Sequence, residues 1–368
     1  MSIPFTPLVQ ALPASVPFTG PETLERRLGA PFRARLGANE SAFGLSELAI
    51  QAMHDQIGIS GCSWYGDPEN HQLRSRLSRI HGIGMENICV DAGIDALLGL
   101  TVRMLIQPGD AVVTSLGAYP TFNYHVNGFG GQLHTVPYAD HHEDPEALLE
   151  SAARHKARLV YLSNPDNPMG TSLSADTVQS MIERLPAGCI LLLDEAYAEF
   201  MTDQHPAPLN MDNPQVLRFR TFSKAYGMAG MRIGYVMGHV DVISGFNRIR
   251  NHFAVNRLAQ IAADASLQDD EMLPRVSQLV SDGRQRIYDL AEKLQLPCLP
   301  SSTNFVAVDL GSAELANHLL QRLEQAGVFL RKPMVPPHDR FLRVGVGTSD
   351  EHDLFVREFQ TGLEQSVR

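Results

Sequence analysis

The chain reads Leu217-Arg-Phe-Arg-Thr-Phe-Ser-Lys-Ala-Tyr-Gly-Met-Ala-Gly-Met-Arg-Ile-Gly-Tyr235 across the stretch that decides its fold. Alternation over residues 216–222 predicts a strand, and Lys224 follows that strand directly, between Ser223 and several glycines, with Arg232 eight residues further on. A single lysine in a loop is usually a solvated surface charge. A hydroxyl and an arginine beside one amine, among small residues, instead suit a site that holds a phosphate next to a carbonyl. Lysine condenses with such carbonyl groups to form Schiff bases.

Upstream of this stretch, short apolar runs alternate with segments of helical periodicity. The apolar runs are 88–90, 111–115, 159–163, 190–193 and 217–222. The segments between them predict helices over 95–106, 119–129, 145–155 and 174–185. This alternation predicts an α/β fold with a mainly parallel central sheet that helices cover on both faces. Ligands bind at the carboxyl ends of the strands in such sheets, so we expect the chemistry just after each apolar run.

The pattern changes after residue 250, and it predicts a smaller α+β domain at the C-terminus. Helices are expected over 256–268, 273–294, 313–325 and 350–363, and strands over 303–309, 328–331 and 341–346. At the other end, residues 1–40 are rich in proline and glycine and predict an arm that packs with the small domain and a partner subunit. We therefore divide the chain into this arm, a large domain over 41–250 and a small domain over 251–368.

The composition excludes several classes of protein. The 368 residues carry a formal net charge of −11 and no basic run, which argues against binding to nucleic acid or to anionic membranes. The sequence has no apolar run long enough to span a bilayer, no features of a signal peptide at its start, and no metal-ligand spacing among its histidines. The four cysteines are far apart, which suits a reducing cytoplasm.

A second candidate site residue is Asp194, which ends an apolar run in Ile190-Leu-Leu-Leu-Asp-Glu-Ala-Tyr197. A carboxylate at the end of a buried strand must be paired or hydrogen-bonded. The residues alone leave two interpretations open: Asp194 either pairs with a cationic group of a ligand or caps the helix that follows.

The segment Ser223-Lys-Ala-Tyr-Gly-Met-Ala-Gly-Met-Arg-Ile-Gly234 resembles the lysine motif of the class I/II aminotransferases. These are fold-type I enzymes that use pyridoxal 5′-phosphate (PLP), and the similarity is strongest to their histidinol-phosphate aminotransferase branch. The resemblance covers nearly the whole chain, with five motifs in the family's order. It implies that Lys224 binds PLP covalently and then serves as general acid and base. It also implies that Asp194 pairs with the pyridine nitrogen of PLP and that Tyr197 donates to the phenolic oxygen.

Further cofactor contacts follow from the same resemblance. In Asn164-Pro-Asp-Asn-Pro-Met-Gly170, Asn167 would bond the phenolic oxygen of PLP and the Asn167–Pro168 bond would be cis, although a two-proline turn needs no function of its own. Phe122, which follows Pro-Thr, would stack on the pyridine ring, although a buried aromatic residue is more often part of the core.

The phosphate of PLP would lie against Gly93-Ile94-Asp95, where a helix begins. The family usually has a hydroxyl residue at position 94 and an acid at position 96, whereas this chain has isoleucine and alanine. Phosphate binding then depends more on backbone N–H groups, Ser223 and Arg232. Tyr65 matches a family tyrosine that reaches the cofactor phosphate of the other subunit, which implies a homodimer with shared active sites.

The resemblance also supplies residues for the substrate. Arg343 matches the arginine that grips the α-carboxylate, and Asn304 lies at a position that lines the same pocket. Arg331 matches an arginine that helps to bind a substrate phosphate in the histidinol-phosphate branch. The Asn39-Glu40 loop also reaches this pocket, but it continues with Ser41, where that branch often has a residue that lines the pocket.

The implied reaction is a transamination in two half-reactions. An amino donor, either histidinol phosphate or an aromatic or other amino acid, passes its amino group to a 2-oxo acid such as 2-oxoglutarate. A PLP-dependent lyase of the same fold, similar to phosphothreonine decarboxylase, is the alternative among enzymes. Transcription regulators with an aminotransferase-like domain also carry a basic helix-turn-helix domain, for which this acidic chain has no room.

Overall fold

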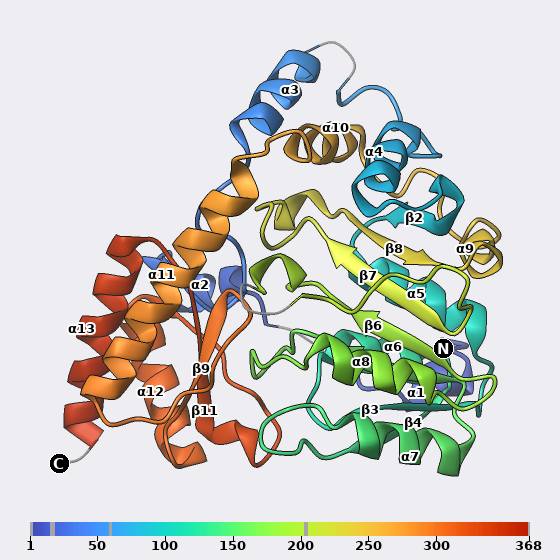
Figure 1. The fold of residues 1–368 in the computed structure, drawn as a ribbon. Coiled ribbons are helices and arrows are strands. Elements are labelled where there is room, and N and C mark those ends of the chain that lie inside the picture. Colours follow the sequence, from blue (N-terminus) through green and yellow to red (C-terminus); the bar gives the residue numbers. More distant parts are fainter. Residues whose placement is uncertain (1–2, 15–18, 59–60, 202–204, 367–368) are drawn as a thin grey trace.

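The computed structural model describes residues 3–14, 19–58, 61–201 and 205–366, and a mainly parallel sheet lies at its centre (Figure 1). Within these residues the sheet has the strand order β2-β8-β7-β6-β5-β3-β4. Its strands are β2 (Ile88–Asp91), β3 (Ala111–Ser115), β4 (Gln132–Val136), β5 (Leu159–Ser163), β6 (Ile190–Asp194), β7 (Val216–Thr221) and β8 (Gly234–Gly238). The strands from β7 to β4 pair in parallel, as the sequence predicts, whereas β8 runs antiparallel to both β7 and β2.

Alternate residues of the central strands enter two different cores. On β5, Leu159 and Tyr161 pack on one face with α5 (Ile94–Leu105), α6 (Pro120–Gly128) and α9 (Val240–Phe246). Val160 and Leu162 pack on the other face with α7 (Pro145–His155) and α8 (Ala175–Glu183). Because both faces are covered, these strands are apolar throughout, which explains why the sequence shows continuous apolar runs there.

The strand β8 lies very close to the start of α5. A Cβ atom placed on Gly234 would lie 2.9 Å from the carbonyl oxygen of Arg220 and 3.1 Å from the amide nitrogen of Ile94. Only glycine fits this approach, and it brings the first turn of α5 next to the end of β7. The end of β7 leads directly to Ser223 and Lys224, so the two segments meet at one end of the sheet.

The C-terminal region contains a small antiparallel sheet and three long helices. Strand β9 (Phe305–Asp309) pairs with β11 (Phe341–Gly345), and the region also contains α11 (Met272–Lys293), α12 (Ala313–Gln325) and α13 (Ser349–Ser366). In Figure 1 the three helices lie together on one side of this sheet, away from the central sheet. The structure thus confirms an α+β arrangement for this part of the chain.

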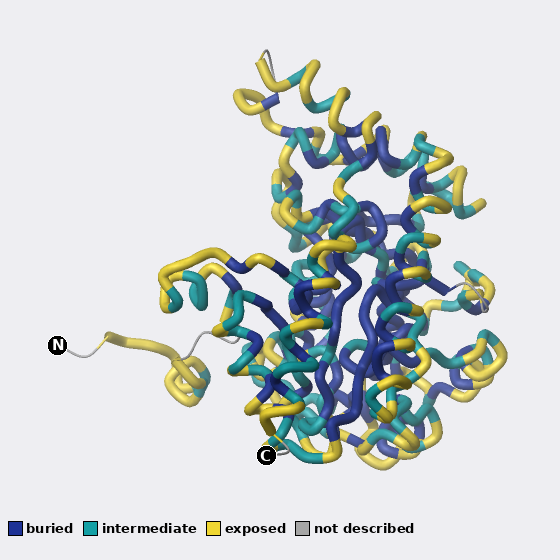
Figure 2. The backbone as a smooth tube through the Cα atoms, turned by 90° about the vertical axis from the view of Figure 1, so that its left-hand side faces the viewer, coloured by how far each residue is buried: buried dark blue, intermediate teal, exposed yellow. Residues whose placement is uncertain are grey.

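The N-terminal arm joins the small domain. Strand β1 (Ala34–Arg35) pairs in parallel with β10 (Val328–Phe329), which is shorter than the strand predicted over 328–331. Two helices precede β1, namely α1 (Pro7–Ala11) and α2 (Pro21–Leu28), and each begins with proline, which suits the first helical position. Figure 2 shows the first described residues extending away from the body of the chain, where most of them are coloured as exposed.

A group of helices lies above the central sheet in Figure 1, beside the upper end of α11. Helix α10 (Arg257–Ser266) packs against α3 (Glu47–Ile57) and also contacts α4 (His71–His81) (Figure 1). Packing therefore groups α10 with helices of the large domain, on the other side of the boundary that the sequence predicts at 250/251. Short 3₁₀ helices complete the described elements: η1 (Met85–Asn87), η2 (Ala198–Phe200), η3 (Ala229–Met231) and η4 (His338–Arg340).

No helix among the described residues is both long enough and apolar enough to cross a bilayer. The four cysteines are all free.

Candidate active site

A cavity of about 330 Å³ opens at the carboxyl ends of β5, β6 and β7. Its wall contains the start of α5, the loops after these strands and part of the loop that follows β1. Predicted site residues that line it are Ile94, Asp95, Asn167, Asp194, Tyr197, Ser223, Lys224 and Arg232. The volume is in the range of sites for small molecules. The structure thus brings together side chains that are separated by more than a hundred residues in the sequence.

Lys224 presents its amine to this cavity. Its Nζ atom donates to the backbone carbonyl of Asn39 at 3.1 Å and lies 5.6 Å from the centre of the Tyr197 ring. Burial lowers the pKa of the amine to about 8, and the positive charges of Arg343 and Arg232 act in the same direction. About a tenth of the amine is therefore uncharged at pH 7, far more than for an ordinary lysine, and this is the form that attacks carbonyl groups and accepts protons.

Asp194 ends β6 with its carboxylate in the cavity wall and only 3% of its surface exposed. Its Oδ2 accepts a hydrogen bond from the hydroxyl of Tyr161 at 2.7 Å, and its Oδ1 accepts one from the backbone N–H of Ala196 at 3.0 Å. In the described part of the chain no basic side chain pairs with it, and burial raises its pKa to about 6. Asp194 does not cap η2, because Tyr197 occupies that N-cap position. A buried carboxylate of this kind suits a cationic ligand group.

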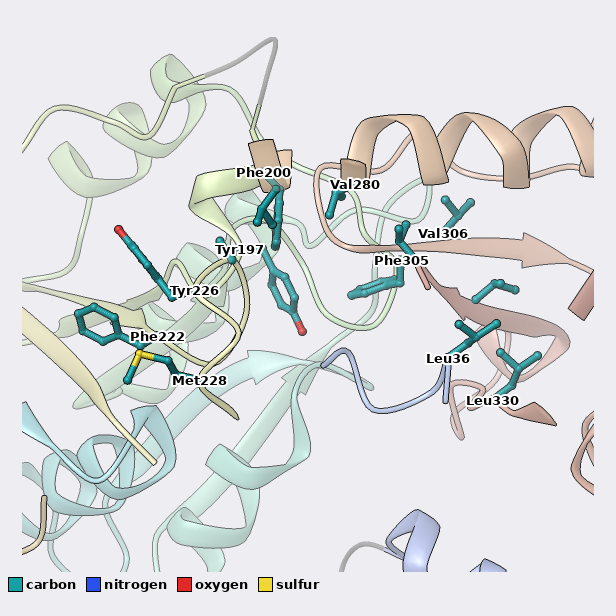
Figure 3. Close-up of a cluster of buried hydrophobic side chains, with 14 of the residues drawn as sticks. Leu36, Tyr197, Phe200, Phe222, Tyr226, Met228, Val280, Phe305, Val306 and Leu330 are labelled. Carbon is teal, nitrogen blue, oxygen red and sulfur yellow. The ribbon is translucent and has the colours of Figure 1, made fainter. Parts of the chain in front are cut away.

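Asn39 connects the loop after β1 to three residues of the site. Its Nδ2 donates to the Tyr197 hydroxyl at 2.8 Å, and its carbonyl accepts both from Lys224 and from Asn304 Nδ2, the latter at 3.2 Å. The Tyr197 ring packs edge-on against Phe305 of the small domain, with 5.6 Å between ring centres (Figure 3). Burial raises the pKa of Tyr197 to about 12, so its hydroxyl keeps its proton and is able to donate.

The opposite wall of the cavity suits an anion. The first N–H groups of α5 have no partner within the helix, and Gly93 precedes them with a φ of 85°. A Cβ atom at position 93 would lie 2.9 Å from Arg232 Nη2, so the glycine lets the guanidinium approach the helix start. Arg232 also pairs with Asp95 at 3.5 Å, and Ser223 lies beside them in the cavity wall.

Phe122 does not have the position that the sequence predicts. Its side chain is fully buried, stacks on Tyr161 with 4.7 Å between ring centres, and is not part of the cavity wall. The aromatic residue of this segment that lines the cavity is Tyr119, whose hydroxyl donates to Asp95 at 2.9 Å. Both residues lie near the start of α6. Tyr119 is the N-cap, with non-helical backbone angles, and its side chain lines the cavity, whereas Phe122 lies inside the helix and is buried in the core.

The cis bond that the sequence predicts at Asn167–Pro168 is also wrong. The cis bonds of the described chain are Asn164–Pro165 and Pro336–Pro337. Residues 166–170 form a compact turn, in which Gly170 N–H donates to the Asp166 carbonyl and Met169 N–H donates to the Asp166 carboxylate. This turn leaves Asn167 in the cavity wall, where its Oδ1 accepts from Arg343 Nη1 at 2.6 Å.

Arg343 on β11 does not line the cavity itself, but it contacts the cavity wall through Asn167. Its Nη2 donates to the Gly37 carbonyl at 2.9 Å, its guanidinium lies 5.1 Å from the centre of the Phe305 ring, and its buried Nε has no partner. Burial lowers its pKa to about 10, so the group stays charged at neutral pH. Arg331 is adjacent, because its carbonyl accepts from the Arg343 N–H at 2.8 Å, but its own guanidinium donates to Thr19 and does not line the cavity.

Tyr65 lies outside the cavity of its own chain. Its side chain is 77% exposed, and its ring stacks on Phe253 with 4.6 Å between centres. Residues that sequence reasoning missed are Tyr119 and Tyr161. Tyr119 lies four residues after the end of β3, and a position just after a strand is the reason that Phe122 was expected in the site. Tyr161 lies inside an apolar run, so nothing in the sequence distinguishes it from a core residue.

The fold defines this chain as a member of the fold-type I class, with a lysine that lines the cavity just after a central strand. The family model for aminotransferase class I and II matches residues 34–359, so the chain belongs to that family. Among solved structures, the histidinol-phosphate aminotransferase from Sinorhizobium meliloti in complex with pyridoxal-5′-phosphate is 44% identical, with a TM-score of 0.95 over 99% of both chains. An aspartate aminotransferase from Thermus thermophilus with maleate, 21% identical over 98% of this chain and all of its own, shares the fold with a TM-score of 0.82.

Curated relatives have the same name as the Sinorhizobium protein. Histidinol-phosphate aminotransferase 1 of Nitrosococcus oceani is 34% identical over 97% of this chain and 96% of its own length. The histidinol-phosphate aminotransferase of Moorella thermoacetica is 32% identical over 91% and 87% of the two chains. The chain is therefore an aminotransferase.

Proposed function

We propose that this aminotransferase uses PLP to move an amino group from histidinol phosphate to a 2-oxo acid such as 2-oxoglutarate. The observation that carries the proposal is one cavity whose wall holds the half-buried amine of Lys224, the buried carboxylate of Asp194 without a basic partner, and the start of α5, which suits an anion. The names of the relatives support histidinol phosphate as the donor. Aromatic amino acids are donors of similar shape and enter the same test.

The side chains of the cavity fit PLP at each of its polar groups. The α5 N-terminus, Ser223 and Arg232 suit the phosphate, and Asp194 suits the protonated ring nitrogen. Asn167 and Tyr197 offer an amide and a hydroxyl for the phenolic oxygen. When bound, PLP supplies an electron sink for the negative charge that forms at the α-carbon of the donor.

The residues of the chain provide the proton transfers. The amine of Lys224, with a pKa lowered to about 8, would take the proton from the carbon that bears the donor's amino group, hold it, and return it on the same face of the cavity. The Asn39 carbonyl orients this amine by its hydrogen bond. Asp194 would keep a proton on the ring nitrogen of PLP. The Tyr197 hydroxyl, which stays protonated, would donate to the phenolic oxygen of PLP.

Arg343 is proposed to bind the anionic group of both substrates. The oxo acid carries an α-carboxylate, whereas histidinol phosphate carries a phosphate and no carboxylate. The Arg343 guanidinium donates to Asn167 in the cavity wall. Arg331 lies next to Arg343, since its backbone carbonyl accepts from the Arg343 N–H. One arginine-rich end of the site would then serve two different anions in the two half-reactions.

Replacing Arg343 with glutamine is expected to lower kcat/KM for the oxo acid by roughly 30-fold or more, because truncating a buried charged partner costs about 2 to 5 kcal/mol. Steady-state kinetics with varied oxo acid measure this loss. The matched control is Arg340→Gln, which removes an exposed arginine that pairs with Asp309 at 2.7 Å. Equal kinetic losses in the two variants would contradict the role of Arg343.

A homodimer with shared sites is also proposed. The exposed Tyr65 is accompanied by other exposed apolar side chains, namely Trp64, Leu48, Ile57 and Phe253. Such a group of exposed apolar residues is typical of an interface. Sedimentation velocity of the purified protein tests the dimer. We further propose a cytoplasmic location, which the free cysteines support.

The donor is tested by recording the absorption spectrum of the PLP-loaded protein while histidinol phosphate, phenylalanine, glutamate and phosphothreonine are added one at a time. We expect histidinol phosphate to convert the bound cofactor to its amine form, and 2-oxoglutarate to restore it. Conversion by phenylalanine alone would make the enzyme an aromatic aminotransferase. Release of carbon dioxide from phosphothreonine with an unconverted cofactor would support the lyase alternative instead.

A further inference from the structure

The carboxylate of Asp194 is held from the strand beside it. Tyr161 lies in the middle of β5, with no exposed surface, and points to the same face of the sheet as Asp194. In the parallel register Tyr161 lies beside Leu192 and Ser163 lies beside Asp194. The long tyrosine side chain therefore reaches two residues along the neighbouring strand to place its hydroxyl 2.7 Å from Asp194 Oδ2.

The Tyr161 ring is fixed by its own packing. It stacks on Phe122 at 4.7 Å between centres with an interplanar angle of 15°, and both side chains are fully buried. The hydroxyl therefore has little freedom to move away from Asp194. Phe122, which the sequence places on the cofactor ring, contacts the cavity only indirectly, through Tyr161 and Asp194.

Each oxygen of the Asp194 carboxylate receives one hydrogen bond. The Tyr161 hydroxyl donates to Oδ2, and the Ala196 N–H donates to Oδ1 at 3.0 Å. Two donors, one on each oxygen, fix the plane of the carboxylate while part of it still lines the cavity. The carboxylate is thereby pre-oriented for a cationic group that enters the cavity.

We propose that Tyr161 is a positioning residue that keeps Asp194 oriented toward the cationic group of its cofactor. This inference rests on the proposed function, in which that group is the protonated pyridine nitrogen of PLP. Tyr161 itself touches neither the cavity nor the reacting atoms, because it does not line the cavity wall. It acts through Asp194, so removing its hydroxyl is expected to change the pKa of that carboxylate and the binding of PLP.

The charges around Asp194 make this hydrogen bond important. Burial and the negative charges of Asp95 on α5 and Glu195 next in the chain raise the Asp194 pKa, whereas the hydrogen bonds from Tyr161 and Ala196 lower it. Glu143, from the loop before α7, is a further buried carboxyl group that interacts with Asp194. Acidic groups thus face Asp194 from several elements, and the Tyr161 hydroxyl is the side chain that opposes them by favouring the charged form.

The first test uses Tyr161→Phe without cofactor, which keeps the ring and its stacking and removes only the hydroxyl. In the folded wild type the Asp194 pKa of about 6 lies above its ordinary value, so charging Asp194 costs stability as the pH rises through that range. The variant raises this pKa further, and the added cost is largest at pH 8, where Asp194 is charged. We expect the loss in urea midpoint at pH 8 to be roughly twice that at pH 5. Equal losses at both pH values would overturn the proposal.

Two controls separate this effect from general packing. Tyr288→Phe removes a hydroxyl that accepts from the Ser301 N–H at 2.8 Å on the small domain and touches no carboxylate, so its loss is expected to be the same at both pH values. In an Asp194→Asn background the pH-dependent part of the Tyr161→Phe effect is expected to vanish. If it persists there, the hydroxyl acts on another group and the proposal fails.

The second test uses the PLP-loaded protein. We expect Tyr161→Phe to weaken equilibrium PLP binding by roughly 10-fold and to shift the pH profile of the half-reaction, since Asp194 then loses a hydrogen bond to its charged form. Normal PLP binding and an unshifted profile would overturn the inference and leave the proposed function intact. A wild-type protein that binds no PLP would overturn the proposed function, whereas the urea measurements would still report on the Tyr161–Asp194 pair.

Discussion

The Lys224→Ala protein is expected to lose transamination by a factor of about 100 to 10,000 from the missing acid and base alone. The reason is the environment of the amine, which faces the cavity, is oriented by the Asn39 carbonyl and has a pKa lowered to about 8 by burial. Removing the side chain leaves no other lysine in the described cavity wall to move the α-proton. Single-turnover absorbance measurements of the half-reaction with histidinol phosphate give the rate directly.

The control for this variant is Lys332→Ala. Lys332 donates to the Asp339 carbonyl at 2.7 Å in the small domain and does not line the cavity. We expect it to keep the wild-type rate. A Lys224→Ala protein that transaminates at a rate close to that of Lys332→Ala would remove the central claim about this site.

The Asp194→Asn protein is expected to keep its fold and to lose about 100- to 1,000-fold in kcat, the range seen when one pre-oriented electrostatic contact is removed. Asparagine has nearly the same shape and keeps an oxygen for the Ala196 N–H, but it carries no charge for the ring nitrogen. The measurement is kcat at saturating donor and acceptor, together with the equilibrium constant for PLP.

Asp241→Asn is the matched control, because the Asp241 side chain is 89% exposed in the first turn of α9. We expect no measurable change in kcat for this variant. The phosphate contacts at α5 and Arg232 are intact in Asp194→Asn, so PLP binding is expected to weaken less than kcat falls. An unchanged kcat in Asp194→Asn would mean that the carboxylate has no part in the chemistry.

The central sheet could be predicted because burial on both faces leaves a continuous apolar signal. Strands β5 and β6 are buried at almost every residue, and the sequence shows them plainly. Strand β4 lies at the edge of the sheet and is partly exposed, so its residues are not continuously apolar. Strand β8 begins and ends with glycine, which leaves too short an apolar run to predict a strand. The position of Lys224 after β7 then followed from the general rule that ligands bind at strand ends.

Three details of the site could not be predicted because they depend on contacts between residues that are distant in the sequence: which aromatic ring faces the cavity, where the cis bond lies, and what holds Asp194. Tyr119 and Phe122 are three residues apart at the start of one helix, and only the packing of Phe122 on Tyr161 decides which ring faces the cavity. The cis bond lies at Asn164–Pro165, and two hydrogen bonds between Asn164 and Leu173 close the loop that contains it, a contact across nine residues that no local pattern reveals. Tyr161 of β5 reaches Asp194 on the adjacent strand β6, two residues beyond its partner in the register, so this contact depends on how the two strands align.

The contacts of the loop after β1 affect the order in which the enzyme folds during its synthesis. Asn39 contacts Lys224 and Asn304 across 185 and 265 residues of sequence, and Gly37 contacts Arg343 across 306. Contacts of such long range form late in folding, because the chain must first close large loops. During synthesis from the N-terminus, the loop and the lysine emerge well before the residues that complete their surroundings. We therefore expect the nascent chain to acquire its central sheet early and its substrate end only after the last strand has left the ribosome.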